Sequence, residues 1–196
     1  NLKTPIRIND FKAIEAAILK NKAYAEFEKL AELSRKNYPK SMLADYQLGL
    51  MYEKGNGVKK NHKEAVCFFQ KAANQDHVNA HSSLGMKYLY GEGVKKDLPE
   101  AVRHLTIAAD KGNVGSQYLL GIMYQFGNGV EKNEGEALRL YTLASTKGSV
   151  SAQFILGLMY ASGTGVKKDE EKAVGYYKLA VNQAFASAQF NLGRMY

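Results

Sequence analysis

The chain has 196 residues and a formal net charge of +8, from 27 Lys and Arg against 19 Asp and Glu. Its 45% hydrophobic and 23% charged residues are typical of a globular protein and exclude a disordered one. A single Cys excludes a disulfide framework and a Cys-rich zinc site, and no apolar run reaches the roughly 20 residues of a membrane span.

The first part of the sequence, residues 1–40, lacks the regular spacing of the rest. It has no initiator Met and no signal segment, so Asn1 is interpreted as a processed or trimmed start, which slightly favours an exported or periplasmic chain over a cytoplasmic one. Asp10 is a candidate N-cap for one helix, and a second helix is expected over roughly 22–36, before Pro39 breaks the chain. We expect a degenerate first repeat that caps the array, because a terminal repeat must cover an apolar end.

From residue 41 the sequence repeats every 36 residues without a gap. Eighteen Gly are many for a helical chain, since an interior Gly costs a helix about 1 kcal/mol relative to Ala, but fifteen of them fall on fixed positions of this repeat. Each unit has a small residue, Leu-Gly, Tyr, Gly-x-Gly-Val and two Ala, in that order. The Leu-Gly pairs are Leu48-Gly49, Leu84-Gly85, Leu120-Gly121, Leu156-Gly157 and Leu192-Gly193. The spacing predicts units over about 41–76, 77–112, 113–148 and 149–184 and a half unit over 185–196.

Each unit begins with a predicted first helix. In the second unit Ala80, Leu84 and Tyr88 step by four residues and form one apolar stripe. Gly85 lies beside this stripe, where the missing Cβ is expected to let a neighbouring backbone approach. Gly-x-Gly then ends the helix, because Gly tolerates the left-handed conformation just past a helix C-terminus. The fifth unit stops after its first helix, so either the natural chain continues or this end packs on something else.

A second helix is predicted after the turn in each of the first four units. Its N-caps are Asn61, Asp97, Asn133 and Asp169. In three units an acid follows the cap by three residues, as in a capping box: Glu64, Glu100 and Glu136. Gly112 and Gly148 end this helix in the second and third units. Asp76 and Ala184 replace them in the first and fourth, so we expect those turns to be closed less cleanly.

The order of residues in each unit, as from Ala152 to Ala180, closely resembles the Sel1-like repeat, a relative of the tetratricopeptide repeat with a longer turn between its helices. The resemblance covers about residues 41–196. It implies an all-α fold, a right-handed α-solenoid of stacked antiparallel helix pairs with a concave face. Proteins of this family are typically non-enzymatic adaptors. They include quality-control adaptors, bacterial host-interaction and envelope-assembly proteins, and immunity proteins that neutralise a secreted toxin.

One arc of the first helix varies between units, two residues before and two, five and six after the repeated Leu. By resemblance to the tetratricopeptide register this arc lines the concave face, and its apolar and aromatic middle suits a binding groove. The predicted partner-binding residues are Tyr46, Met86, Tyr90, Tyr118, Ile122, Phe126, Phe154 and Leu158. Packing between adjacent first helices is the alternative interpretation for Tyr46, Tyr118, Phe154 and Phe190. Exposure is expected for Tyr90 and Phe126, because polar residues hold the same position in the first and fourth units.

Lysines recur in the turn after Gly-x-Gly-Val and predict a basic edge. They are Lys59, Lys60, Lys95, Lys96, Lys132, Lys167 and Lys168. In the functional interpretation this edge binds an anionic partner. Such a partner is one of three kinds, an acidic protein, a phosphate-rich polymer or a membrane surface. The alternative is that exposed turns simply need soluble side chains. Nucleic acid is not expected as a partner, because the 22 Lys far outnumber the 5 Arg and Arg is the better planar reader of phosphate.

No catalytic or metal-binding constellation is evident, and no metal or other cofactor is expected. His77 and His81 have the spacing of a metal pair on one helix face, but His77 is expected before the helix begins and a third ligand is missing. The position of His81 is expected to be a polar surface position, since other units fill it with Gln117, Gln153 and Gln189. Cys67 is expected to be partly exposed and has no identifiable base to activate it.

The function predicted from these features is a non-enzymatic scaffold, most consistent with a bacterial protein, that binds another protein or a peptide segment on the concave face. The alternative is an immunity protein that blocks a secreted toxin by direct binding. Cysteine-rich Sel1-like proteins have been assigned β-lactam-binding or β-lactamase activity, and they carry a Cys pair in each repeat. This chain has one Cys and no Ser-x-x-Lys motif, so a β-lactam-binding or hydrolysing enzyme is a remote alternative.

Overall fold

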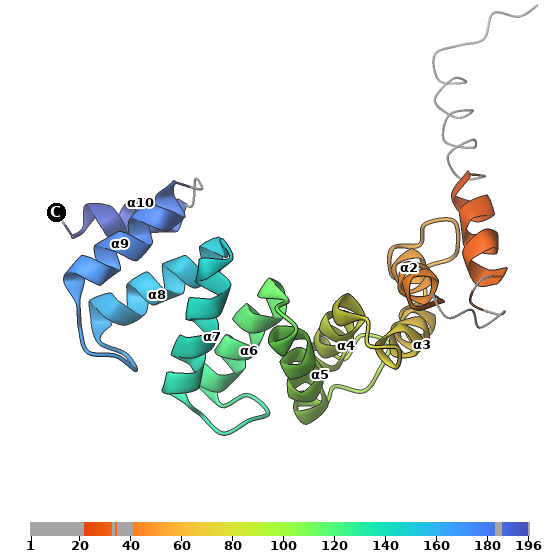
Figure 1. The fold of residues 1–196 in the computed structure, drawn as a ribbon, viewed down its shortest axis with the longest axis horizontal. Coiled ribbons are helices and arrows are strands. Elements are labelled where there is room, and N and C mark those ends of the chain that lie inside the picture. Colours follow the sequence, from red (N-terminus) through yellow and green to blue (C-terminus); the bar gives the residue numbers. More distant parts are fainter. Residues whose placement is uncertain (1–21, 33, 35–40, 183–185, 196) are drawn as a thin grey trace, which may run out of the picture. The chain divides into compact units, whose positions relative to one another are not determined.

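The computed structural model describes residues 22–32, 34, 41–182 and 186–195, and the regular structure within them is helical (Figure 1). Residues 22–32 form a helix where the second N-terminal helix was expected, whereas the helix expected after Asp10 lies outside the described residues. The helices that follow are α2 (Ser41–Lys54), α3 (His62–Ala73), α4 (Val78–Tyr90), α5 (Leu98–Asp110), α6 (Val114–Phe126), α7 (Glu134–Thr146), α8 (Val150–Ser162), α9 (Glu170–Val181) and α10 (Ala186–Gly193). In this described part of the chain, no helix combines the length and the apolar character that crossing a membrane requires.

The helices belong to two compact units. The first contains the helix over 22–32, α2, α3 and residues 92–95. The second contains His81–Gly91 of α4 and the chain from Lys96 onward. Within the units, α2 packs with α3, α6 with α7 and α8 with α9, while α5 packs on α6 and α7 on α8. The chain is therefore the all-α solenoid of stacked helix pairs that the repeat predicts.

The core consists of the small and apolar positions of the repeat. The Leu of the first helices are at most 2% exposed, namely Leu48, Leu84, Leu120 and Leu156. The two Ala positions of the second helices are fully buried, namely Ala65, Ala72, Ala101, Ala108, Ala137, Ala144, Ala173 and Ala180. Larger side chains at these Ala positions would overpack the contact between helices. The 36-residue repeat thus mainly specifies which residues pack in the core between the helices.

In the first four repeats the Gly that follows the repeated Leu makes room for a side chain of the second helix, whereas no described atom lies within 4 Å of a Cβ added to Gly193. A Cβ added to Gly121 would stand 2.7 Å from the Tyr141 ring. At Gly85 the nearest atom is Leu105 Cγ at 2.6 Å, and the Leu105 backbone nitrogen lies farther away at 3.3 Å. The expected close approach of a neighbouring backbone at Gly85 is therefore present, but a side chain of the second helix lies nearer still.

The Gly-x-Gly turn ends one helix and also brings successive repeats together. Gly127 caps α6 in the left-handed conformation, with φ 71°. The second Gly of each turn faces the second helix of the preceding repeat. An added Cβ would stand 2.5 Å from Leu98 at Gly129 and 2.8 Å from Glu134 at Gly165. A side chain at either position would push two repeats apart.

The predicted N-caps are confirmed, but the predicted capping boxes are only half formed. Side chains that accept a hydrogen bond from a first-turn backbone N–H are those of Asn61, Asp97, Asn133 and Asp169. In a capping box the acid would accept from the N–H of the cap residue. That N–H instead donates to the Tyr carbonyl of the preceding helix, as from Asp97 to Tyr88 at 3.0 Å. Glu100 and Glu136 form ion pairs with the Arg three residues on, so the cap closes the turn without them.

The turn after the second helix forms with either Gly or Asp at its left-handed position. After α5, Gly112 has φ 88° and the next N–H donates to the Ala108 carbonyl at 2.9 Å. After α3, Asp76 has φ 67° and the next N–H donates to the Ala72 carbonyl at 3.1 Å. The expectation that this turn is closed less cleanly is therefore wrong at Asp76, because the closing hydrogen bond forms. What costs energy there is the left-handed backbone conformation of a residue other than Gly. Ala184 lies outside the described residues.

Candidate interaction surface

The predicted partner-binding residues divide into an exposed set and a half-buried set. Tyr90 is 63% exposed, Phe126 65% and Met86 38%. The half-buried residues are Tyr46, Tyr118, Ile122, Phe154 and Leu158. Tyr90 and Phe126 are the last residues of α4 and α6, directly before the left-handed Gly of the turn. Because the chain turns away at that Gly, each ring has few neighbours and stays in solvent.

The half-buried aromatic residues pack onto the second helix of their own repeat. Ring centroids lie 5.7, 6.0 and 6.1 Å apart in the tilted pairs Tyr46–Phe69, Tyr118–Tyr141 and Phe154–Tyr177. Tyr118 also packs against the cluster that contains Ala152 of the next first helix. Phe190, for which the same packing was considered, is 69% exposed. The ring contacts of these three residues are therefore with second helices, not between adjacent first helices as the alternative interpretation had them, and Phe190 is exposed.

A cavity of about 260 Å³ adjoins the exposed ring of Phe126. Its lining includes Gln125, Thr164 and the ion pair between Lys132 and Glu134, whose Nζ and Oε1 atoms lie 2.7 Å apart. The surface therefore combines one large apolar group with hydrogen-bonding groups of balanced charge. This combination is typical of contacts between proteins.

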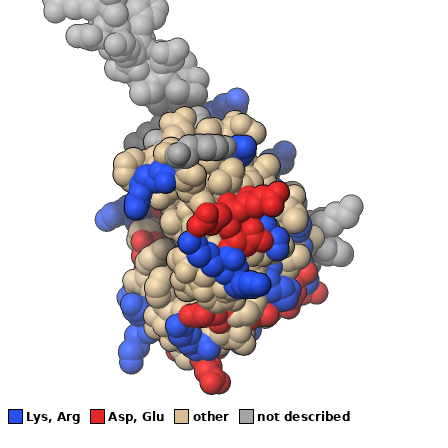
Figure 2. All heavy atoms as spheres, turned by 90° about the vertical axis from the view of Figure 1, so that its left-hand side faces the viewer, with Lys and Arg blue, Asp and Glu red and all other residues tan. Residues whose placement is uncertain are grey.

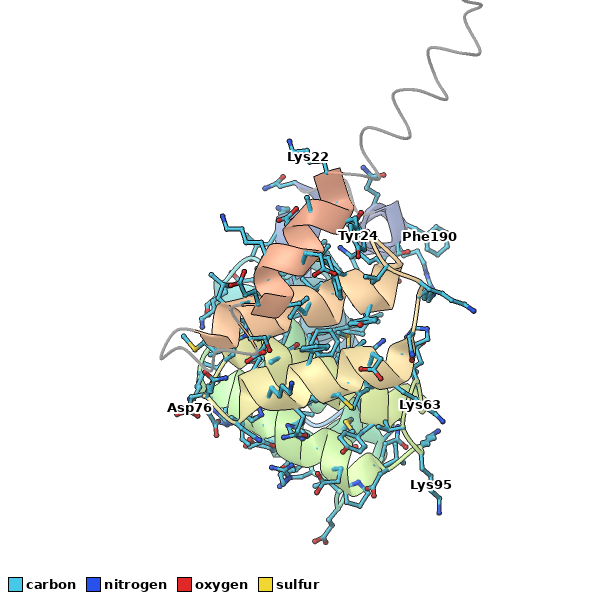
Figure 3. The ribbon with its side chains drawn as sticks, turned by 90° about the vertical axis from the view of Figure 1, so that its right-hand side faces the viewer. Lys22, Tyr24, Lys63, Asp76, Lys95 and Phe190 are labelled. Carbon is cyan, nitrogen blue, oxygen red and sulfur yellow. The ribbon has the colours of Figure 1, made fainter. Side chains whose placement is uncertain are left out.

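The predicted lysine edge is exposed at every position, but part of its charge is neutralised within the chain. Lys132 pairs with Glu134 and Lys168 with Glu170, each at 2.7 Å. The hydrogen bond and charge of Lys168 hold the pKa of Glu170 below its usual range. Figure 3 shows Lys95 pointing away from the helices of the first of the two compact units. Basic and acidic side chains interleave on the face drawn in Figure 2, which favours the interpretation of the lysines as soluble turn residues.

His81, Gln117 and Gln153 are buried, which corrects the expected polar surface position at these three, whereas the fourth residue of the set, Gln189, is exposed. The exposed fractions are 7%, 3% and 5% for His81, Gln117 and Gln153. Gln117 Nε2 donates to the Ala109 carbonyl at 3.1 Å, and Gln153 Nε2 donates to the Ser145 carbonyl at 3.4 Å. Both carbonyls belong to the last turn of a second helix and also accept from the N–H of the following turn Gly, Gly112 or Gly148, at 2.9 Å, so each Gln supplies a second donor. The position is polar because it completes a helix end inside the core.

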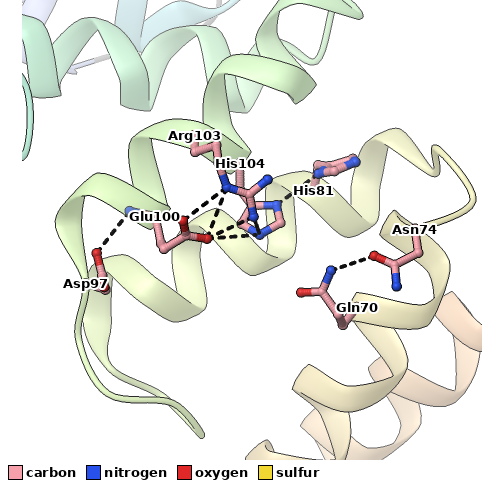
Figure 4. A network of polar contacts seen from close by, with 7 residues as sticks. All are labelled: Gln70, Asn74, His81, Asp97, Glu100, Arg103 and His104. Carbon is pink, nitrogen blue, oxygen red and sulfur yellow. Dashed lines mark hydrogen bonds and ion pairs between the residues drawn. The ribbon is translucent and has the colours of Figure 1, made fainter.

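In the second repeat the same position joins a network of titratable side chains (Figure 4). His81 Nδ1 lies 2.9 Å from His104 Nδ1, and Arg103 donates to His104 Nε2 at 2.9 Å while it pairs with Glu100. His104 is 1% exposed. Burial, then the charges of Arg103 and His81, lower the pKa of His104 to about 4 against the opposing effect of Glu100. Sequence analysis missed this network, although the signal was a His where other units have Phe68, Leu140 and Tyr176.

Metal and thiol chemistry find little support in the described residues. Among them, no three His, Cys, Asp or Glu side chains are grouped so that they could hold a metal ion. His77 lies directly before α4 and stacks on Tyr46, with ring centroids 4.4 Å apart. Cys67 is exposed on α3. The candidate metal pair is therefore two histidines with separate partners.

Comparisons with known proteins agree with this fold. Five stretches match the model of the family described as Sel1 repeat, over residues 43–77, 78–113, 114–149, 150–185 and 186–196. A Sel1 repeat protein from Oxalobacter formigenes is 33% identical, with a TM-score of 0.77 over 92% of this chain and 78% of its own. A protective antigen of uropathogenic Escherichia coli strains, which displays an SLR fold, is 35% identical with a TM-score of 0.80 over 85% of this chain. This chain spans 36% of that protein.

A more distant structure shares the fold alone. An immunity protein from Pseudomonas aeruginosa is 24% identical, with a TM-score of 0.52 over 94% of this chain and 70% of its own. No curated protein matches the chain. Because the family model matches consecutive units from residue 43 to residue 196, the chain belongs to the Sel1 repeat family.

Proposed function

We propose that this chain is a non-enzymatic scaffold that binds a partner protein or peptide through the first-helix surface around Tyr90 and Phe126. The observation that carries the proposal is that two large aromatic side chains, 63% and 65% exposed, hold the same position in successive repeats. Fully burying one such side chain is worth about 1.5–3 kcal/mol. Aromatic residues of this kind are enriched among those that dominate binding energy at protein contacts.

The composition around the two rings supports a protein partner. Met86 and Ile122 continue the apolar surface along α4 and α6, while the paired charges beside Phe126 give it a polar rim. An apolar centre within a polar rim is the usual arrangement of a protein interface. A solenoid presents such residues from several repeats at once, so a partner segment can contact more than one.

The test replaces Tyr90 and Phe126 with Glu, singly and together, and measures affinity for a partner that has been purified by binding to the wild-type chain. We expect the double variant to lose at least about 30-fold in affinity, equivalent to roughly 2 kcal/mol. Helicity by circular dichroism should not change, because neither ring is buried. Leu143→Glu on α7 is the control, since that side chain is 37% exposed on a second helix. Equal affinity of the double variant and the control would reject this surface.

The same purified partner separates a scaffold from an immunity protein. A partner enzyme that is inhibited in a tight one-to-one complex would identify the chain as an immunity protein. A partner without inhibited activity, bound more weakly, fits an adaptor. The immunity proteins of similar fold do not decide between these roles, because their identity to this chain is 24% and 20%.

A further inference from the structure

The tyrosine that packs on the first-helix Gly has a hydrogen-bond partner in the third repeat. Its ring covers Gly121, and its hydroxyl donates to Gln125 Oε1 at 2.7 Å. Tyr141 and Gln125 are thus a matched pair across α6 and α7. In the second repeat the corresponding residues are Leu105 and Leu89, which need no polar partner.

The fourth repeat has the same tyrosine without the glutamine. Tyr177 covers Gly157, where an added Cβ would stand 2.5 Å from its ring. Its ring forms a tilted pair with Phe154, as the ring of Tyr141 does with Tyr118 in the third repeat. Tyr177 is 2% exposed, but Ala161 stands where the third repeat has Gln. Among the described residues its hydroxyl has no hydrogen-bond partner. The oxygen of this hydroxyl is not among the fully buried polar atoms that lack a partner, so it retains contact with solvent and a ligand can reach it.

The space left by the missing glutamine is an open cavity of about 480 Å³ between α8, α9 and α10. Leu158 and Met195 give it apolar walls, and Tyr177, Asn191 and Arg194 contribute polar groups. The cavity also borders Lys168 and Glu170, which neutralise each other at 2.7 Å.

One positive charge remains at this cavity. Arg194 is exposed, and its guanidinium forms no ion pair with any residue that the structure describes. Its charge favours the ionised form of the Tyr177 hydroxyl, opposing the burial that raises the pKa of that group. Because Tyr177 and Arg194 both line this one cavity, they can act on the same carboxylate.

We propose that this cavity binds a carboxylate, carried by an acidic side chain of a partner protein. One carboxylate oxygen accepts from the Tyr177 hydroxyl in place of the missing glutamine oxygen, and the group pairs with the Arg194 guanidinium. Hydrogen bonds between charged partners are roughly twice as strong as neutral ones, so Arg194 selects an anion over an amide. Leu158 and Met195 contact the methylene groups of the ligand. Only the choice of a protein as the source of the carboxylate rests on the proposed function.

The test titrates the full chain with N-acetyl-Leu-Glu-Leu-amide and follows the NMR signals of Tyr177 and Arg194. The Gln analogue of this peptide is the neutral comparison, and acetate supplies a free carboxylate without a peptide. We expect the Glu peptide to bind at least about 10-fold more tightly than the Gln analogue, since a charged hydrogen bond is worth roughly 1.5–3 kcal/mol. Binding of acetate as tight as that of the Glu peptide would instead assign the site to a small acid and overturn the protein source.

The sharpest variant is Ala161→Gln, which restores the pair of the third repeat. The new amide should accept from Tyr177, occupy the cavity, raise the melting temperature and abolish binding of the Glu peptide. Loss of binding together with higher stability cannot come from misfolding. Tyr177→Phe and Arg194→Gln should each weaken binding without preventing folding. Phe holds the position of Tyr177 in the first repeat, and the Arg194 side chain is exposed. Undiminished binding in Ala161→Gln, or no preference for Glu in the wild type, would overturn the proposal.

Three further variants distinguish this site from its surroundings. Gln125→Ala frees the Tyr141 hydroxyl in the third repeat, where Leu158 holds the position that corresponds to Arg194, so no second carboxylate site should appear. The Tyr90→Glu and Phe126→Glu variants should titrate with the Glu peptide as the wild type does. Failure of the proposed partner surface therefore leaves this site standing, and failure of this site leaves that surface standing.

Discussion

The second and third repeats have the same backbone plan but different polar cores. In the third repeat the buried amide of Gln117 donates to a backbone carbonyl, and the residue of α7 that corresponds to His104 is Leu140. In the second repeat the corresponding residues are His81 and His104, which contact each other through their Nδ1 atoms. Lys87, 3% exposed, also stands where the third repeat has Met. The same solenoid position can thus hold a pH-independent contact or a titratable one.

The contacts of His104 determine which of its nitrogens carries the proton. Arg103 donates to Nε2, so Nε2 is an acceptor without a proton. In the neutral ring the proton then sits on Nδ1 and is donated to His81 Nδ1. A second proton on His104 would place a positive charge against Arg103 in a buried site. The second repeat is therefore built for a neutral histidine, which the third repeat does not contain.

The largest expected effect is a loss of stability on acidification that belongs to the second repeat. Because burial lowers the pKa of His104 to about 4, the unfolded chain takes up a proton near pH 6.5 and the folded chain resists it. The contribution of the neutral His104 to the free energy of unfolding is fully present above pH 6.5. It is lost as the pH drops toward 4, and the loss is about 3 kcal/mol at most. Urea unfolding at a series of pH values measures this slope.

A double variant converts this contact into that of the third repeat. His81→Gln with His104→Leu should flatten the pH dependence between 6.5 and 4 while the carboxylates continue to titrate in both proteins. A wild-type profile as flat as that of the variant would show that His104 is not protected from protonation in the folded state.

Sequence analysis predicted the features that repeat and missed those that differ between repeats. Leu84, Ala101 and Gly85 recur in each of the first four units, and their burial or close contact there follows from spacing alone. The burial of Gln117 does not follow from spacing, because a Gln is stable in the core only when a carbonyl of the preceding helix faces it. Tyr177 resembles Tyr141 in sequence, and the difference between them lies in a residue 16 positions earlier in the chain.

A second comparison between these repeats uses the Gly beneath the second-helix side chain. In Gly121→Ala the new Cβ meets the rigid Tyr141 ring, which its bond to Gln125 holds in place, so we expect a loss of about 2 kcal/mol. In Gly85→Ala the neighbour is Leu105, which can rotate, so the loss should be about 1 kcal/mol. Thermal unfolding of the two variants measures the difference.

An exposed helical Gly supplies the control for helix propensity. Nothing lies within 4 Å of a Cβ added to Gly175 in α9, so Gly175→Ala should gain about 0.5–1 kcal/mol. If Gly121→Ala and Gly85→Ala also stabilised the protein, the side-chain contact would not explain why Gly recurs at this position.

The smallest expected effect concerns the turn after the second helix, where the first repeat departs from its successors. Asp76 adopts φ 67° and keeps the closing hydrogen bond, so its turn has the backbone plan of the Gly turns at a position where Gly is absent. Asp76→Gly should relieve this conformation and gain about 0.5 kcal/mol, because the entropy that Gly loses on folding offsets part of the relief. Gly148→Asp is the reciprocal change at φ 87°, with no neighbour within 4 Å, and should cost about 1 kcal/mol. Opposite signs in urea unfolding would attribute the preference for Gly at this turn to the backbone, whereas equal signs would attribute it to contacts of the Asp side chain.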